Sequence, residues 1–186
     1  MILPAGFGVI FDWDGVVIDS EDFHRRSWKL LQAEENLTME EGAFEISFGM
    51  QNEQIIPNVF KWAEPGDTER IQALANRKES LYRELIRAES IDPLPGVVTL
   101  LDELASAAVP TSVGSSTPRA NIDAVMEVIG VTGKFREIVA AGDVTNGKPN
   151  PEVFLTAASR LGCTPGYSVV IEDAQRLQPE ARRRGA

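Results

Sequence analysis

The feature that most constrains this chain is a short apolar run that ends in carboxylates. Residues 8–11 (Gly-Val-Ile-Phe) are followed at once by Asp12, Trp13, Asp14 and Gly15. A continuous apolar run of this length is typical of a strand that is buried on both faces of a parallel sheet. The sequence therefore predicts two carboxylates at the carboxyl end of a buried strand.

Three further strand patterns follow later in the chain, and helical patterns separate them. We expect strands over residues 111–114, 137–140 and 168–171, and helices near residues 97–104, 120–129 and 151–161. Strands that alternate with helices form right-handed crossovers and place the helices on both faces of a parallel sheet. The expected fold class is α/β, with a doubly wound, Rossmann-like parallel sheet.

The stretch from about residue 20 to residue 90 differs, because its apolar residues have helical spacing and no strand pattern interrupts it. Two helix faces are expected there: Phe23, Ser27, Leu30 and Leu31, then Ile71, Leu74, Lys78, Leu81 and Leu85. A turn rich in Pro and Gly at residues 92–96 marks the return to the first domain. We therefore predict a core domain of residues 1–15 and 93–186, and an all-helical cap domain of residues 16–92 inserted after the first strand.

The composition limits the kinds of partner that the chain can bind. A formal net charge of −10 argues against nucleic-acid binding, which normally needs a basic surface. An acidic protein must hold a phosphorylated substrate locally, through a metal and a few placed cations. The single cysteine, Cys163, cannot form an intramolecular disulfide, and the sequence contains neither a signal-peptide pattern nor a run of 18 apolar residues. We expect a cytoplasmic protein that binds no membrane.

Polar residues follow each predicted strand, at the edge where ligands bind in open α/β sheets. They are Asp12, Asp14, Ser115, Ser116, Thr117, Lys148, Glu172 and Asp173. Carboxylate oxygens suit Mg²⁺, and one carboxylate can attack phosphorus while a metal and a lysine neutralise the phosphoryl oxygens. Each feature alone also has a structural explanation, as a turn, a helix N-cap or a solvated loop. Their occurrence together, in this order, favours catalysis.

The sequence resembles the haloacid dehalogenase superfamily, in particular its β-phosphoglucomutase-like phosphatases with a helical cap. Four ordered signatures carry the resemblance: residues 11–16 (Phe-Asp-Trp-Asp-Gly-Val), 113–117 (Val-Gly-Ser-Ser-Thr), 147–154 (Gly-Lys-Pro-Asn-Pro-Glu-Val-Phe) and 170–174 (Val-Ile-Glu-Asp-Ala). Together they span nearly the whole chain.

The resemblance implies a role for each matched catalytic position. Asp12 is similar to the nucleophile that becomes phosphorylated, and Asp14 to the general acid and base. Ser115 is similar to the hydroxyl that holds a phosphoryl oxygen, and Lys148 to the cation that bridges the phosphoryl group and the nucleophile. The implied cofactor is Mg²⁺, held by Asp12, Asp14 through its backbone carbonyl, Glu172 and Asp173.

The resemblance also implies substrate-binding positions. Ser116 and Thr117 belong to the second signature, and His24, Gly49, Asn52 and Lys78 match substrate positions of the cap. His24 has an alternative interpretation, as a residue on a solvated helix face. Asn52 stands where sugar-phosphate mutases of the family carry an arginine for the second phosphate, which weakens the mutase interpretation.

Three functions follow as hypotheses. The first is Mg²⁺-dependent hydrolysis of a small phosphorylated metabolite through an aspartyl-phosphate, by a monomer. The second is β-phosphoglucomutase-type isomerisation of a sugar phosphate. The third is an inactive truncated remnant, because residues 176–186 depart from the family pattern and the sequence stops early. Haloacid dehalogenation is disfavoured, because that branch replaces the second aspartate and Asp14 is present here.

Overall fold

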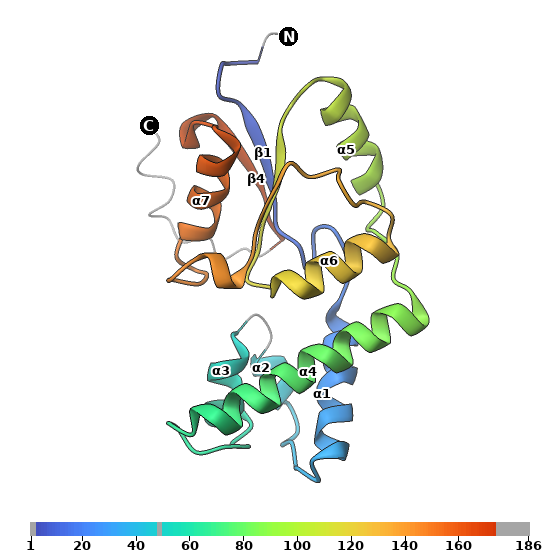
Figure 1. Cartoon of the computed structure of the whole chain (residues 1–186), viewed down its shortest axis with the longest axis vertical. Helices are drawn as coiled ribbons and strands as arrows, with labels where there is room; N and C mark the ends of the chain where they lie inside the picture. The colour runs from blue at the N-terminus through green and yellow to red at the C-terminus, as the bar shows by residue number, and fades with distance from the viewer. Residues whose placement is uncertain (1–2, 48–49, 174–186) are drawn as a thin grey trace. The chain divides into compact units, whose positions relative to one another are not determined.

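A computed structural model describes residues 3–47 and 50–173 of the chain. The chain divides into two compact units, Met1–Asp19 with Ile91–Ala186, and Ser20–Ser90. The first is an α/β unit and the second is a helical unit (Figure 1).

The α/β unit is built on a parallel sheet of four strands in the order β3-β2-β1-β4. The strands are β1 (Gly8–Phe11), β2 (Thr111–Gly114), β3 (Glu137–Val139) and β4 (Ser168–Ile171). All four residues of β1 and of β2 are buried, as expected of strands in a parallel sheet covered on both faces. The predicted fold class is confirmed.

Helices cover both faces of this sheet. They are α5 (Val97–Ser106), α6 (Arg119–Val128) and α7 (Glu152–Leu161), with short 3₁₀ turns at η2 (Ala141–Asp143) and η3 (Pro165–Tyr167). Figure 1 shows α7 on one side of the sheet and α5 and α6 on the other. The buried face of α7 packs with Ile10 of β1 and Val139 of β3 in one hydrophobic cluster, to which Cys163 also belongs. Cys163 is therefore part of the core.

The helical unit contains no strand among its described residues, which are 20–47 and 50–90. Its elements are α1 (Glu21–Glu34), α2 (Ala43–Ser47), α3 (Asn52–Gln54), the π-helical turn η1 (Ile55–Val59) and α4 (Thr68–Glu89). Its core gathers Trp28, Phe60 and Trp62, whose rings meet edge-on or tilted. The predicted inner face of α1 is wrong at Leu30, which is 40% exposed, because Trp28 and Leu31 point into the core instead.

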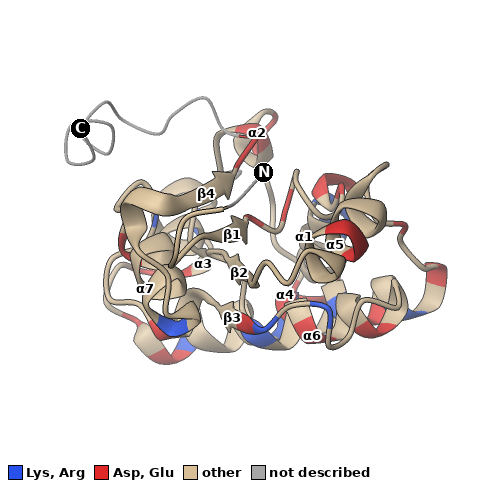
Figure 2. Cartoon of the chain, turned by 90° about the horizontal axis from the view of Figure 1, so that it is seen from above, with Lys and Arg blue, Asp and Glu red and all other residues tan. Residues whose placement is uncertain are grey.

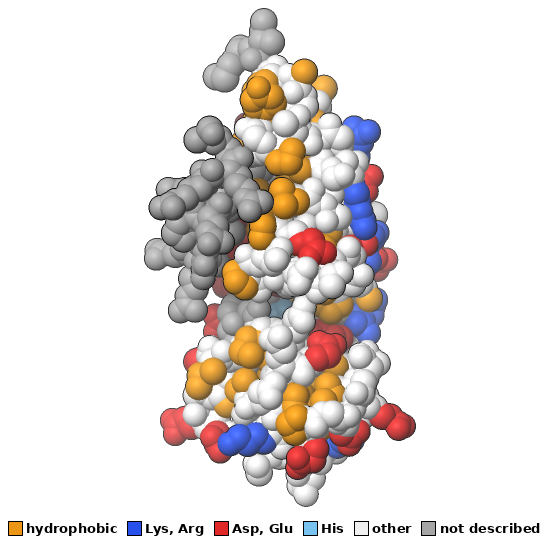
Figure 3. Space-filling view, turned by 90° about the vertical axis from the view of Figure 1, so that its left-hand side faces the viewer, with side chains coloured by type: hydrophobic (Ala, Val, Ile, Leu, Met, Phe, Trp, Pro, Cys, Tyr) orange, Lys and Arg blue, Asp and Glu red, His pale blue; other side chains and the backbone are white. Residues whose placement is uncertain are grey.

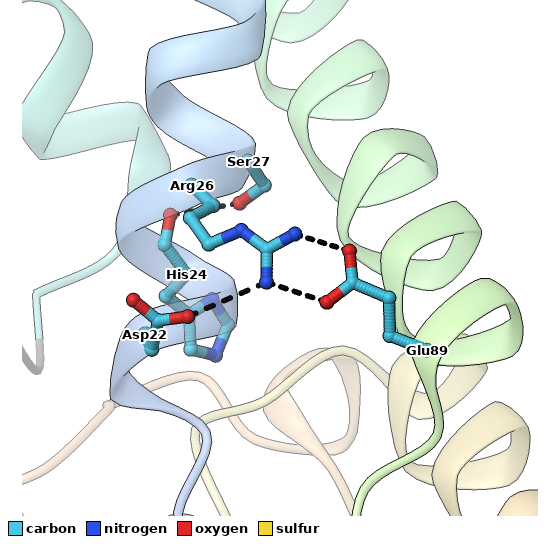
Figure 4. A network of polar contacts seen from close by, with 5 residues as sticks. All are labelled: Asp22, His24, Arg26, Ser27 and Glu89. Carbon is cyan, nitrogen blue, oxygen red and sulfur yellow. Dashed lines mark hydrogen bonds and ion pairs between the residues drawn. The ribbon is translucent and has the colours of Figure 1, made fainter.

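Ion pairs join the two long helices of this unit at one end. Arg26 of α1 donates from two guanidinium nitrogens to the carboxylate of Glu89 in α4, and it also lies 3.4 Å from Asp22 (Figure 4). In the same turn of α1, the Ser27 hydroxyl donates to the backbone oxygen of His24 at 2.8 Å. A bidentate arginine–carboxylate pair has a restricted geometry, so this exposed contact is compatible with only a narrow range of positions of α1 against α4.

The unit boundary falls after Asp19, whereas the sequence analysis placed the first boundary after Gly15. Residues 16–18 stay with the sheet because Ile18 forms isolated bridges to Asp14 and to Pro93. The amide of Leu94 also donates to the backbone oxygen of Val17 at 2.8 Å. The entry and exit of the helical insertion are thus tied together within the α/β unit.

The chain carries more acidic than basic side chains. Asp and Glu number 28 against 18 Lys and Arg, and Figure 2 shows acidic segments on many of the helices. On the face drawn in Figure 3, exposed hydrophobic side chains occur in small groups among polar atoms. No helix among the described residues is long and apolar enough to cross a membrane.

Candidate active site

Three carboxylates meet at the carboxyl ends of β1 and β4. The amide of Asp12 donates to the backbone oxygen of Ile171 at 2.9 Å, which continues the pairing of the two strands. Asp12, Glu172 and Asp173 each offer an oxygen, and these oxygens lie within 4.8 Å of one another. The order of the strands reverses here, because β2 lies on one side of β1 and β4 on the other. Ligands of open α/β sheets bind at such a switch point.

Lys148 joins two of these carboxylates. Its ammonium nitrogen lies 2.7 Å from Asp12 Oδ2 and 2.8 Å from Glu172 Oε2. It also lies 4.7 Å from the centre of the Phe154 ring. Burial raises the pKa of Asp12 from 3.8 to about 7, although the attraction of Lys148 opposes this rise and the charge of Glu172 adds to it. The site therefore needs cations to keep Asp12 ionised.

The loop that carries Lys148 is tied to the first turn of α7. Glu152 accepts hydrogen bonds from the amides of Thr145 and Asn146, at 2.7 and 3.0 Å, and from the Asn146 side chain at 2.7 Å. We expect this clamp to hold Lys148 near Asp12. No role for Glu152 was predicted from the sequence, although a glutamate is expected in the first turn of a helix, where it can accept hydrogen bonds from backbone amides.

Gly15 lies close to the Asp173 side chain, in a backbone conformation that other residues rarely adopt. Its φ is +79°, and a Cβ atom there would lie 2.2 Å from Asp173 Oδ2. In the same turn the Gly15 amide donates to the backbone oxygen of Ile18 at 2.8 Å. No role for Gly15 was predicted from the sequence, although glycine is the residue expected at positive φ beside a close contact.

Ser115 and Thr117 follow β2 and lie beside Asp14. Ser115 is 2% exposed and Thr117 is 6% exposed. The Thr117 amide donates to Ser115 Oγ at 3.1 Å, and the Thr117 hydroxyl donates to Asp14 Oδ2. Ser115 Oγ thus accepts one hydrogen bond and keeps its own proton, for which no acceptor occurs in residues 3–47 and 50–173. Ser116 is partly buried in the same turn.

A second polar cluster lies inside the helical unit. The Lys78 ammonium is 2.7 Å from His24 Nδ1 and donates to Glu79 Oε1 at 2.9 Å, and Asn52 Nδ2 donates to the same oxygen at 2.6 Å. His24 stacks on Tyr82 with ring centres 4.3 Å apart. Three predicted substrate positions, His24, Asn52 and Lys78, are thus brought together, and His24 does not lie on a solvated helix face.

Glu79 was not anticipated in this cluster. It is 8% exposed, and although burial raises its pKa, the combined effect of Lys78, His24 and Asn52 leaves that pKa below its usual value. A glutamate next to a predicted site lysine was the only signal in the sequence. The remaining predicted substrate position, Gly49, lies outside the described residues.

Comparison with known proteins links this geometry to a family. A family model described as haloacid dehalogenase-like hydrolase matches residues 8–176. Among solved structures, a beta-phosphoglucomutase from Clostridium difficile superimposes with a TM-score of 0.79 at 26% identity, covering 96% of this chain and 81% of the other.

Three curated relatives are named for different activities. The chain is 33% identical over 166 residues to the chloroplastic 5-amino-6-(5-phospho-D-ribitylamino)uracil phosphatase of Arabidopsis thaliana, covering 88% of this chain and 43% of that protein. It is 31% identical over 171 residues to the beta-phosphoglucomutase of Bacillus subtilis, covering 90% and 75%. It is 31% identical over 169 residues to the fructose-1-phosphate phosphatase YqaB of Escherichia coli, covering 90% and 86%.

Proposed function

Because this chain belongs to the haloacid dehalogenase-like hydrolases, we propose that it is a phosphatase that hydrolyses a small phosphorylated metabolite through an aspartyl-phosphate on Asp12. The observation that carries the proposal is the contact of 2.7 Å between Lys148 Nζ and the buried carboxylate of Asp12, at the switch point of the sheet. A carboxylate that is buried but paired with a cation can stay ionised and attack phosphorus.

The reaction has two halves. A carboxylate oxygen of Asp12 attacks phosphorus, the bond to the ester oxygen breaks, and the departing oxygen takes a proton from Asp14. Water then attacks the phosphorus of the aspartyl-phosphate and gives a proton to Asp14, and the bond from phosphorus to Asp12 breaks. Inorganic phosphate and an alcohol are the products, and both aspartates return to their starting states.

Ser115 and Lys148 are proposed to hold the phosphoryl group during these steps. The Ser115 hydroxyl retains a proton that it can donate to a phosphoryl oxygen. Lys148 carries positive charge next to the nucleophile, where negative charge gathers during transfer. We assign the substrate's phosphoryl contacts to these two side chains and to the backbone at Ser116.

The residues present also fit a magnesium ion. Asp12, Glu172 and Asp173 provide hard oxygen donors at distances from one another that one cation can span. We propose that they hold Mg²⁺ together with the backbone carbonyl of Asp14. When bound, the ion would neutralise phosphoryl charge and favour the ionised form of Asp12.

We propose further that His24, Asn52 and Lys78 of the helical unit set substrate specificity. Lys78 is paired with Glu79, and Asn52 donates to the same carboxylate, so this cluster offers little free positive charge. Such a cluster suits hydroxyl groups better than a second phosphate. This supports hydrolysis of a monophosphate over a mutase reaction, which proceeds through a bisphosphate.

Sugar-phosphate isomerisation remains the second candidate, since one relative that is 31% identical is named beta-phosphoglucomutase. A panel of phosphorylated metabolites, with release of inorganic phosphate as the readout, tests the first candidate. Conversion of glucose 1-phosphate to glucose 6-phosphate, with the bisphosphate activator supplied, tests the second. If isomerisation is faster than phosphate release, the mutase function becomes the first candidate. If neither assay shows turnover that depends on Asp12, both candidate functions are refuted.

A further inference from the structure

The Thr117 side chain contacts the proposed acid and base directly. Its hydroxyl donates to Asp14 Oδ2. The threonine hydroxyl is the donor in this contact, so it occupies Oδ2 and leaves the other carboxyl oxygen of Asp14 to carry the proton that the reaction transfers. Thr117 is 6% exposed, which means that water competes little for the bond. The resemblance had suggested a substrate contact for Thr117, but its hydroxyl proton is already engaged by Asp14.

Thr117 is itself held in place from two sides. Its amide donates to Ser115 Oγ at 3.1 Å, and its backbone oxygen accepts from the amide of Ala141 at 3.1 Å. Ser115 follows β2 and Ala141 begins the turn after β3, so the ends of two neighbouring strands fix this residue. The next residue, Pro118, precedes α6 and restricts the backbone of Thr117 to extended conformations.

We propose that Thr117 is a positioning residue that orients the carboxylate of Asp14 for both proton transfers. The inference rests on the proposed function, because it assigns a task within the two-step reaction. Thr117 exchanges no proton with the substrate. It fixes the direction of the carboxylate that protonates the departing oxygen and later deprotonates the attacking water. Proton transfer depends on such alignment, and small misplacements lower rates about 100-fold.

The test compares Thr117→Val, which keeps the shape and loses the hydroxyl, with Thr117→Ser, which keeps the hydroxyl. With the alkyl phosphate that the wild type hydrolyses fastest, Thr117→Val should lower kcat by about 10- to 100-fold while KM changes little. Thr117→Ser should recover most of kcat. A substrate-binding role would instead raise KM in Thr117→Val, and that result would overturn the proposal.

The leaving group provides a second readout. p-Nitrophenolate departs without an acid, so Thr117→Val should release one equivalent of it in a fast burst from p-nitrophenyl phosphate. Steady turnover should then be slow, because hydrolysis of the aspartyl-phosphate still needs the base. A loss of the burst, with native unfolding behaviour, would contradict the assignment.

A double-mutant comparison separates positioning from independent action. If Thr117 acts through Asp14, adding Thr117→Val to Asp14→Ala should lower kcat by less than about two-fold, because effects of residues that act as a unit do not add. A full additive loss would refute the inference. Crystal structures of the metal-free variants offer a readout apart from activity: Asp14 should adopt more than one orientation in Thr117→Val and a single one in Thr117→Ser. If the wild type cleaves neither ester, the proposed function itself fails.

Discussion

Asp12→Asn should stabilise the metal-free protein while it abolishes turnover. Asparagine is nearly isosteric with aspartate but carries no charge. The substitution therefore removes the nucleophile and also the free-energy cost of burying an anion. Lys148 keeps a partner after this substitution, because Glu172 lies 2.8 Å from its ammonium group. The variant therefore leaves no cation without a carboxylate.

The magnitude follows from the pKa of Asp12, which burial raises from 3.8 to about 7. Below the lower value both folded and unfolded states hold the proton, and the carboxyl group has no pH-dependent effect. As the pH rises, the unfolded chain ionises first, so the wild type loses stability until the folded pKa is passed. At about 1.4 kcal/mol for each pKa unit, the loss reaches about 4 kcal/mol. The asparagine side chain of the variant does not titrate, so the difference between variant and wild type should grow by this amount.

The assay is urea unfolding in EDTA, followed by circular dichroism, from about pH 4 to about pH 8. The free energy of unfolding of Asp12→Asn should equal that of the wild type at the acidic end and exceed it by about 3 to 4 kcal/mol at the basic end. Asp123→Asn is a matched control, because Asp123 is an exposed carboxylate in the same unit that pairs with Arg119. Its difference from the wild type should stay small at every pH.

Magnesium should reduce or reverse the difference in stability between Asp12→Asn and the wild type. A ligand that binds only the folded state stabilises it, and the wild type has one more carboxylate ligand than the variant. Mg²⁺ should thus raise the stability of the wild type more than that of Asp12→Asn. A difference in EDTA that is absent or independent of pH would refute the argument from burial. Failure of Mg²⁺ to stabilise the wild type would instead support an inactive remnant.

Three other perturbations test the remaining assignments. EDTA should stop phosphate release and Mg²⁺ should restore it, whereas Ca²⁺ should inhibit it because its bonds to oxygen are longer and its coordination is looser. Phosphate release that continues in EDTA would contradict the proposed metal site. Glu79→Leu should lower the free energy of unfolding by about 3 kcal/mol, because the Lys78 side chain is 3% exposed and loses its carboxylate partner. If urea unfolding shows a decrease in this free energy of less than about 1 kcal/mol, the prediction is wrong. Glu152→Ala should lower kcat/KM about ten-fold by releasing the loop of Lys148, and unchanged kinetics would show that the clamp is dispensable.

The sequence alone determined the fold class and most of the elements. Three of the four strands, residues 8–11, 111–114 and 168–171, begin and end where the sequence predicts them. Strand β1 shows why: all four of its residues are buried, and a strand buried on both faces needs a continuous apolar run, so its ends can be located from the local sequence. The long helices were predictable for a similar reason, because a period of 3.6 residues shows which face is buried. The prediction was wrong at Leu30, because helical spacing alone allowed either of two adjacent faces of α1 to be buried. Packing against α4 determines which of the two faces is buried.

Only the tertiary structure decided which side chains meet. Asp12 and Glu172 are 160 positions apart, and they become neighbours because β4 pairs with β1 rather than with β3. The hydroxyl of Thr117 donates to Asp14, and Glu79 accepts hydrogen bonds from both Lys78 and Asn52. No periodic pattern in the sequence indicates these contacts. Periodicity records the average environment of a helix or strand, which is a local property. A hydrogen bond depends on the positions of two particular atoms, and those are set by the packing of whole elements against each other.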